Sequence, residues 1–165
     1  MDKIIVVMGT RPEAIKLVPV VQKLKQEEKF QTRVVTTAQH RELLDGVLEL
    51  FNLKPDYDLD IMSVDQSLTE ITINILAGLK DILSAEKPAL VLVHGDTTTT
   101  FMGALSSFYK QIDIGHVEAG LRTNNKYSPY PEEMNRHLTG VLTDLNFAPT
   151  INNKNNLLIK ILVPR

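Results

Sequence analysis

The chain has 165 residues, with 18 Lys or Arg against 20 Asp or Glu, so its formal net charge at pH 7 is −2. A near-neutral net charge offers no overall attraction for nucleic acid, so we do not expect a nonspecific polyanion binder. The absence of cysteine excludes disulfides, thiol nucleophiles and cysteine-ligated metal centres. With 43% hydrophobic and 23% charged residues, the composition is typical of one globular domain. The first apolar run, 4–8, is too short for a signal peptide or a transmembrane helix, so we expect a cytoplasmic protein outside the membrane.

Strand and helix patterns alternate along the chain. Apolar runs predict five strands, at 4–8, 33–37, 89–93, 112–117 and 145–148. Apolar residues at helical spacing predict helices at 12–24, 43–51, 68–82, 97–109 and 131–142, whereas the proline-containing segment 54–60 is predicted as a polar connection. This alternation predicts an α/β domain with a mostly parallel, doubly wound sheet.

Polar segments follow four of the predicted strands. They are 9–13, 36–41, 94–100 and 116–123. Ligands of open parallel sheets bind outside the carboxyl ends of the strands, so we expect these segments to meet at one edge of the sheet. Any one of them has a plain alternative as a helix cap, but four together favour a binding or catalytic site.

The first of these segments has the features of a phosphate site. Gly9, Thr10 and Arg11 lie at a strand-to-helix turn, where backbone N–H groups and a guanidinium favour an anion. Lys16 on the same helix is a second candidate cation, with a solvated surface charge as the alternative. Neither G-x-G-x-x-G nor a phosphate loop ending in G-K-[ST] is present, so NAD and ATP chemistry lack their usual support and we expect no cofactor.

Three carboxylates near this edge are candidate proton carriers: Asp96, Glu118 and Glu132. Each has a structural alternative. Asp96 is placed to cap a helix, and Glu118 is near enough in sequence to pair with Arg122. Glu132 suits the helix dipole at a first turn and is spaced i, i+4 from Arg136.

His94 and His116 raise the question of a metal site with Asp96 and Glu118. Both pairs lie at strand ends and match no recognised ligand motif, so no metal is expected. The residues therefore predict a phosphate-bearing ligand, such as a nucleotide-sugar, beside carboxylates that move protons. An enzyme and a binding module both remain open at this point.

Five motifs in register go further. They are 9–16 (GTRPEAIK), 37–41 (TAQHR), 93–100 (VHGDTTTT), 115–123 (GHVEAGLRT) and 130–136 (YPEEMNR). Together they closely resemble the bacterial non-hydrolysing UDP-N-acetylglucosamine 2-epimerases. The resemblance runs from Lys3 to about Thr150 and continues weakly through residues 156–158.

The resemblance implies an isomerase that interconverts UDP-N-acetylglucosamine and UDP-N-acetylmannosamine for cell-surface polysaccharide synthesis. In the family, anti elimination of UDP gives a 2-acetamidoglucal, and syn re-addition of UDP follows on the inverted C2. A hydrogen on C2 is too weakly acidic for a carboxylate to remove directly, but departure of the diphosphate acidifies it. Cations must hold the diphosphate while carboxylates carry the proton, which needs no redox cofactor.

Matching positions carry the family's roles onto this sequence. Asp96, Glu118 and Glu132 match the catalytic carboxylates, with Glu118 expected to transfer the C2 proton and Asp96 to be its partner. The positions expected to bind the UDP-sugar substrate are Arg11, Lys16, His94, His116 and Arg122.

A second, activating UDP-N-acetylglucosamine binds in some bacterial members near the positions of Gln39, His40 and Gln66. Asp65 departs from the basic residue that such members tend to carry beside this glutamine. The resemblance therefore leaves allosteric activation in doubt for this chain.

Family enzymes have two Rossmann-like domains in the B-type glycosyltransferase arrangement, with the active site between them. We expect 1–150 to be the N-terminal domain and 151–165, which ends in Leu-Val-Pro-Arg like a protease-cleavable tag, to be a truncated linker or tag-derived tail. The C-terminal domain would be the intramolecular partner in the full-length protein. Without it we expect near-inactivity, an exposed apolar patch and a tendency to self-associate, including as a homodimer.

Two other readings stay open. A noncatalytic nucleotide-sugar binding module would keep the site residues without the reaction. The acceptor-side domain of a glycosyltransferase would share the fold, although the motif around Glu118 argues against it.

Overall fold

The structure is a computed structural model that describes residues 1–38, 41–63 and 65–159. Gln39 and His40, two of the predicted allosteric positions, lie outside these residues. The described strands are β1 (Asp2–Met8), β2 (Phe30–Thr36), β3 (Tyr57–Asp58), β4 (Leu90–His94), β5 (Asp113–Val117) and β6 (Leu145–Phe147). The helices are α1 (Arg11–Gln26), α2 (Arg41–Leu50), α3 (Leu68–Glu86), α4 (Thr98–Tyr109), α5 (Glu132–Leu142) and α6 (Ile151–Ile159).

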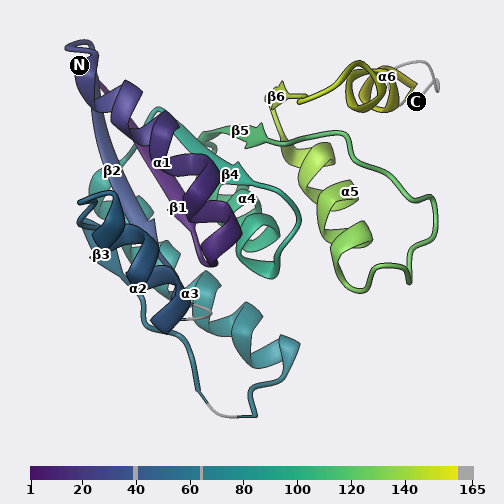
Figure 1. Ribbon diagram of the computed structural model, residues 1–165, viewed down its shortest axis with the longest axis horizontal. Coiled ribbons are helices and arrows are strands. Elements are labelled where there is room, and N and C mark those ends of the chain that lie inside the picture. The colour runs from purple at the N-terminus through teal and green to yellow at the C-terminus, as the bar shows by residue number, and fades with distance from the viewer. Residues whose placement is uncertain (39–40, 64, 160–165) are drawn as a thin grey trace.

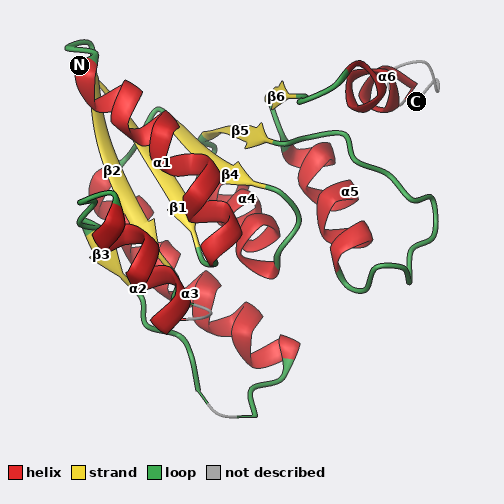
Figure 2. Ribbon diagram, viewed as in Figure 1, coloured by secondary structure: helices red, strands yellow, loops and turns green. Residues whose placement is uncertain are grey.

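The described strands form one sheet in the order β3-β2-β1-β4-β5-β6, and every neighbouring pair is parallel (Figures 1 and 2). The strand order reverses between β1 and β4, where a doubly wound sheet opens a crevice at its carboxyl edge. The predicted Rossmann-like doubly wound parallel sheet is therefore confirmed. The loops that follow β1, β4 and β5 are the ones placed to build a site there.

Alternation along β1 creates two cores, one on each face of the sheet. Ile4, Val6 and Met8 pack with apolar residues of α1 and α2. Ile5 and Val7 pack with apolar residues of α3 and α4 on the opposite face. Because helices cover both faces of the sheet, every residue in the centre of β1 is buried, which explains the continuous apolar run from which this strand was predicted.

Two elements were missed by the sequence patterns. The prediction of five strands is wrong, because Tyr57–Asp58 adds a sixth strand inside the segment expected to be a connection. It pairs with the end of β2 through only two residues, too few to give a periodic signal. Residues 151–159, expected in a linker or tail, form helix α6, which lies beside β6 (Figure 1).

The polar side chains of α6 attach it to the loop after β5. Asn153 donates to the carbonyl of Ala119 at 3.3 Å, and Asn156 donates to the carbonyl of Gly120 at 2.9 Å. Gly120 has a φ of +93°, and a Cβ there would lie 2.2 Å from the backbone oxygen of Asn153. A glycine is therefore required where α6 packs on this loop.

We expect Gly120→Ala to destabilise the domain by about 1–3 kcal/mol through backbone strain, in addition to the clash with α6. Urea unfolding of the variant and of the parent chain measures the difference. Gly46→Ala is the matched control, because Gly46 lies within α2 with no atom within 4 Å of an added Cβ. That change should stabilise by about 0.5–1 kcal/mol, and a similar result for Gly120→Ala would contradict the packing described here.

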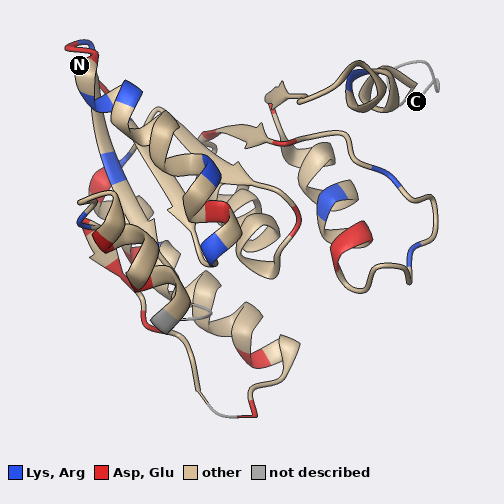
Figure 3. Cartoon of the chain, in the orientation of Figure 1, with Lys and Arg blue, Asp and Glu red and all other residues tan. Residues whose placement is uncertain are grey.

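Charges of both signs are interspersed along the elements (Figure 3). None of the described helices has the length and apolar character needed to cross a membrane.

Candidate functional site

The loops after β1, β4 and β5 meet at the carboxyl edge of the sheet. Thr97 after β4 donates to Glu13 in the first turn of α1 at 2.6 Å. Lys16 of α1 reaches Glu118 after β5, with its Nζ 2.6 and 2.7 Å from the two carboxylate oxygens. Asn135 of α5 donates to the backbone carbonyl of Asp96 at 2.9 Å. The predicted convergence is thus confirmed for three of the four segments, 9–13, 94–100 and 116–123, whereas the fourth, 36–41, is only partly described.

Glu118 has an unusual backbone conformation for a residue with a side chain. Its φ of +62° lies in the left-handed region, and the N–H of the next residue is held by the carbonyl of Phe147 at 3.1 Å. Its carboxylate meets Lys16 and lies 3.2 Å from His94 Nε2. The expected alternative, an ion pair with Arg122, is not formed. Strained conformations of this kind concentrate at functional sites.

Two buried histidines lie near Glu118 and Asp96. His94 is 4% exposed and His116 is 1% exposed. Burial lowers the pKa of His94, against the attraction of the Glu118 carboxylate. Burial also lowers the pKa of His116 to about 4, although the bond between its Nε2 and the carbonyl of Gly95 opposes this. Both imidazoles are therefore suited to stay neutral near pH 7.

We expect the His116 ring to show no titration in NMR spectra between about pH 8 and about pH 5. Nε2 bonds to Gly95, and among the described residues nothing accepts from buried Nδ1. Because the pKa is about 4 when folded and 6.5 ordinarily, the unfolded chain binds the extra proton, and stability falls as the pH drops through that range. The slope should be about 1.4 kcal/mol per pH unit at most and should shrink in His116→Gln. A ring that titrates near 6.5 would disprove the neutral assignment.

Asp96 is held by α5 and does not cap α4. The N-cap of α4 is Thr97, so the structural alternative for Asp96 is wrong. Arg136 Nη1 donates to Asp96 Oδ2 at 2.8 Å. Burial raises the pKa of the Asp96 carboxyl, Arg136 lowers it, and the nearby charges of Glu132 and Glu118 raise it further.

Glu132 begins α5 and lines a pocket of about 380 Å³. The other lining residues come from the starts of α1, α3, α4 and α5: Thr10, Pro12, Leu68, Thr97, Thr98, Pro131 and Asn135. The expected i, i+4 pair between Glu132 and Arg136 is not formed, because Arg136 turns to Asp96 and Glu133 instead. Glu132 therefore lines this pocket without that ion pair.

Glu13 is a site residue that the sequence analysis did not single out. It is 3% exposed and accepts from the N–H groups of Gly9 and Thr10 at 2.7 and 2.8 Å. Its other oxygen accepts from Thr97 and Thr100. Burial raises the pKa of Glu13, against the bonds from Thr97, Gly9 and Thr10. The signal was present in the sequence as a capping box, Thr10 followed by Glu13.

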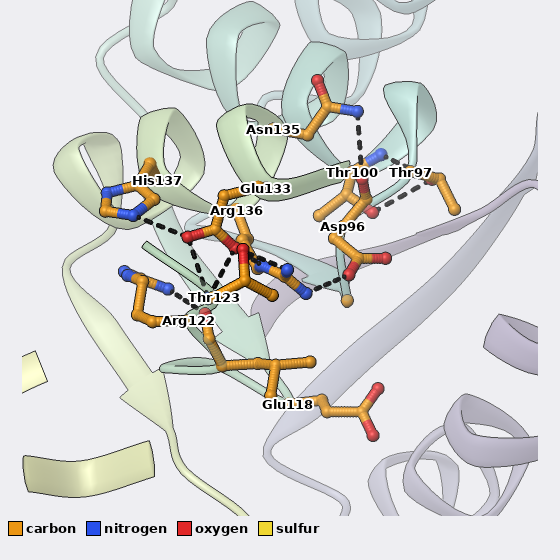
Figure 4. A network of polar contacts seen from close by, with 12 residues as sticks. Asp96, Thr97, Thr100, Glu118, Arg122, Thr123, Glu133, Asn135, Arg136 and His137 are labelled. Atoms are coloured by element: carbon orange, nitrogen blue, oxygen red, sulfur yellow. Dashed lines mark hydrogen bonds and ion pairs between the residues drawn. The ribbon is translucent and has the colours of Figure 1, made fainter. Parts of the chain in front are cut away.

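Glu133 and Arg136 were also missed as site residues. Glu133 is 1% exposed, and its carboxylate accepts from Arg136 Nε at 2.7 Å (Figure 4). It also accepts from the N–H groups of Thr123 and Asn124, at 3.1 and 3.0 Å. Burial alone would raise the pKa of Glu133, but the bonds from Thr123, Arg136 and Asn124 lower it to about 2. Its i, i+3 spacing from Arg136 was the available signal.

The remaining predicted positions differ in their surroundings. Arg11 is the first residue of α1 and is exposed. Arg122 donates to the carbonyl of Leu121 at 2.6 Å, and burial lowers the pKa of its guanidinium. Gln66 donates to Ile61 and accepts from Ser63, so its amide bonds within its own loop. Within the part of the chain that the structure describes, no cluster of three His, Asp or Glu side chains suits a metal ion.

Comparison with known proteins identifies the closely similar sequences and folds. The family model described as UDP-N-acetylglucosamine 2-epimerase matches residues 22–163. The UDP-N-acetylglucosamine 2-epimerase of Yersinia pestis is 60% identical over 156 residues, which are 94% of this chain and 42% of that protein. The chain therefore spans about two fifths of the length of the curated relatives it matches.

Two of the solved structures with the same fold are epimerases with bound ligands. The UDP-GlcNAc 2-epimerase of Neisseria meningitidis, bound to UDP-GlcNAc, has a TM-score of 0.94 and 57% identity, over 97% of this chain and 43% of that one. The enzyme of Methanocaldococcus jannaschii, in complex with UDP-GlcNAc and UDP, has a TM-score of 0.90 and 39% identity, over 97% of this chain and 44% of that one.

Proposed function

Because this chain belongs to the UDP-N-acetylglucosamine 2-epimerase family, we propose that it supplies the catalytic carboxylates for interconverting UDP-N-acetylglucosamine and UDP-N-acetylmannosamine. The observation that carries the proposal is the arrangement at the carboxyl edge of the sheet. Asp96 and Glu118 follow neighbouring strands, and each has a cation on its carboxylate, Arg136 and Lys16 respectively.

The reaction begins with loss of UDP from C1 of the sugar. The C1–O bond breaks, UDP leaves with its electron pair, and Glu118 takes the proton from C2 to give a 2-acetamidoglucal. UDP then adds back to C1 while a proton returns to C2 on the opposite face, with Asp96 as the partner acid. No step consumes an oxidant or a reductant, so the overall change is an isomerisation.

Lys16 and Arg11 are proposed to bind the leaving diphosphate and stabilise its negative charge. Both lie on the first turns of α1, where the helix dipole also favours an anion. Lys16 is shared with Glu118, so a phosphate that attracts Lys16 releases the carboxylate to act as a base. The buried, neutral His94 lies with its Nε2 3.2 Å from Glu118 Oε2.

Glu132, His116 and Arg122 complete the set at this edge. Glu132 borders the pocket beside the start of α1 and is proposed to assist the proton transfers. His116 holds the backbone at Gly95, one residue before Asp96. Arg122 is proposed as a substrate contact. An activating UDP-sugar near Gln66 stays a prediction.

A second domain and a second copy of the chain are part of the proposal. In the proposed enzyme the active site lies between two domains. In other enzymes, orientation of the reacting groups lowers the activation barrier by about 7–11 kcal/mol, and stabilisation of the developing charge lowers it by about 3–4 kcal/mol. We therefore expect the 165-residue chain by itself to be nearly inactive. Homodimerisation is proposed from the resemblance.

The test is an NMR assay of UDP-N-acetylglucosamine with two samples, the chain alone and the chain joined to the remaining part of the N. meningitidis relative. We expect UDP-N-acetylmannosamine to form only with the joined protein. Binding of the UDP-sugar without epimerisation in either sample would support a noncatalytic binding module. Release of UDP only on addition of an acceptor sugar would support a glycosyltransferase instead.

A further inference from the structure

We propose that Glu133 and Arg136 are positioning residues for Asp96, and that Glu133 acts by aiming the Arg136 guanidinium at one oxygen of that carboxylate. The inference rests on the proposed function for the importance of Asp96. It adds two residues of α5 that touch no substrate in this account but determine how Asp96 is presented.

The geometry is a chain of three side chains. Glu133 Oε2 accepts from Arg136 Nε at 2.7 Å and lies 2.5 Å from its Nη2. The opposite corner of the same guanidinium, Nη1, donates to Asp96 Oδ2 at 2.8 Å. A guanidinium is a rigid plane, so fixing its Nε edge also fixes the direction of Nη1 (Figure 4).

Burial makes the arrangement unlike an ordinary surface ion pair. The side chains of Arg136 and Glu133 are 4% and 1% exposed, whereas Asp96 is 30% exposed. The buried Glu133–Arg136 pair is thus held in place by the surrounding protein, and the Asp96 carboxylate that it orients is accessible to a ligand. Among the described residues, none bonds to the second oxygen of Asp96, so Oδ1 is the one available for a proton.

Glu133 also connects this network to the loop between β5 and α5. The N–H groups of Thr123 and Asn124 donate to its carboxylate, and Asn135 holds the backbone of Asp96 at 2.9 Å. The position of Asp96 and that of the loop after Glu118 are therefore fixed by the same few residues of α5. This arrangement explains why a carboxylate is buried at the second position of that helix.

The charges near Asp96 come from three parts of the chain. Arg136 and Glu132 lie on α5, Glu118 lies in the loop after β5, and Lys16 of α1 is paired with the Glu118 carboxylate. Removing a negative charge from this group lowers the pKa of Asp96 by simple electrostatics. Loss of the bond from a correctly aimed Arg136 raises it, so the two effects have opposite signs.

The experiment is a ¹³C NMR titration of the Asp96 carboxyl in the whole 165-residue chain, comparing the parent with Glu133→Gln. If Glu133 aims Arg136, the variant raises the pKa of Asp96 by about 1 unit, even though a negative charge has been removed. Glu132→Gln is the matched control, because it makes the same chemical change one residue earlier. That variant should lower the pKa of Asp96, since Glu132 acts on it through charge alone.

A fall or no change of the Asp96 pKa in Glu133→Gln overturns the positioning role. If Glu133→Gln does not fold, Arg136→Lys provides the test, because lysine keeps the positive charge but lacks the planar guanidinium. A rise in the pKa of Asp96 is again expected. An unchanged pKa of Asp96 in Arg136→Lys would overturn the proposal. The titration uses no substrate, so its failure is distinct from a failure to find epimerase activity.

Discussion

Replacing Glu118 with glutamine in the joined protein is expected to lower kcat by about 10²- to 10⁴-fold, which is the usual contribution of a general acid–base group. Glutamine keeps nearly the same shape but cannot accept the C2 proton. Binding of UDP should be kept or slightly strengthened, because the phosphates are assigned to Arg11 and Lys16 and the variant removes the carboxylate charge that pairs with Lys16. Turnover is measured by the NMR assay, and UDP binding by calorimetry.

Glu49→Gln is the control for this experiment, since Glu49 is an exposed residue of α2 outside the candidate site. It should leave both turnover and binding unchanged. Unchanged turnover in Glu118→Gln would remove this residue from the proton transfer. Loss of UDP binding together with turnover would indicate instead that Glu118 holds the phosphate site together.

Glu133→Ala is expected to destabilise the chain by about 3–5 kcal/mol, because it leaves the buried Arg136 guanidinium without its closest counter-charge. The variant also removes the acceptor for two backbone N–H groups of the loop before α5. That loss is a large part of the about 5–15 kcal/mol that stabilises a typical domain. Urea unfolding followed by circular dichroism measures it.

Glu27→Ala provides the comparison for an exposed helix pair. Glu27 forms an i, i+4 ion pair with Lys23, and the two side chains are 42% and 72% exposed. Its loss should cost less than about 0.5 kcal/mol, since exposed pairs contribute little. Equal effects of the two substitutions would mean that the Glu133 pair is not energetically special.

Much of the fold could be predicted because the sheet is covered on both faces. The central strands β1 and β4 give continuous apolar runs, and the helices show the spacing of one apolar face. The two-residue strand Tyr57–Asp58 was missed because it gives no such pattern. Helix α6 was missed because its hydrogen bonds to the loop after β5 are made by asparagines, and a hydrophobic pattern does not detect such polar contacts.

The location of the site could be predicted from the sequence, but most of its hydrogen bonds and ion pairs could not. Parallel strands bring their following loops to one edge, so the clustering of Asp96 with Glu118 follows from topology alone. Their partners do not: Lys16 was considered for a phosphate and Arg122 for Glu118, yet Lys16 pairs with Glu118. Arg136 had two acidic neighbours at helical spacing, and only packing decides between Glu132 and Glu133.

The most direct test of the central claim is to run the joined protein with UDP-N-acetylglucosamine in deuterated water and examine C2 of the sugar by NMR. The account predicts that UDP-N-acetylmannosamine carries deuterium at C2 and that the recovered UDP-N-acetylglucosamine gains it as well, because the proton passes through exchangeable carboxylates. Epimer that retains the original hydrogen at C2 would contradict proton transfer by Glu118 and Asp96.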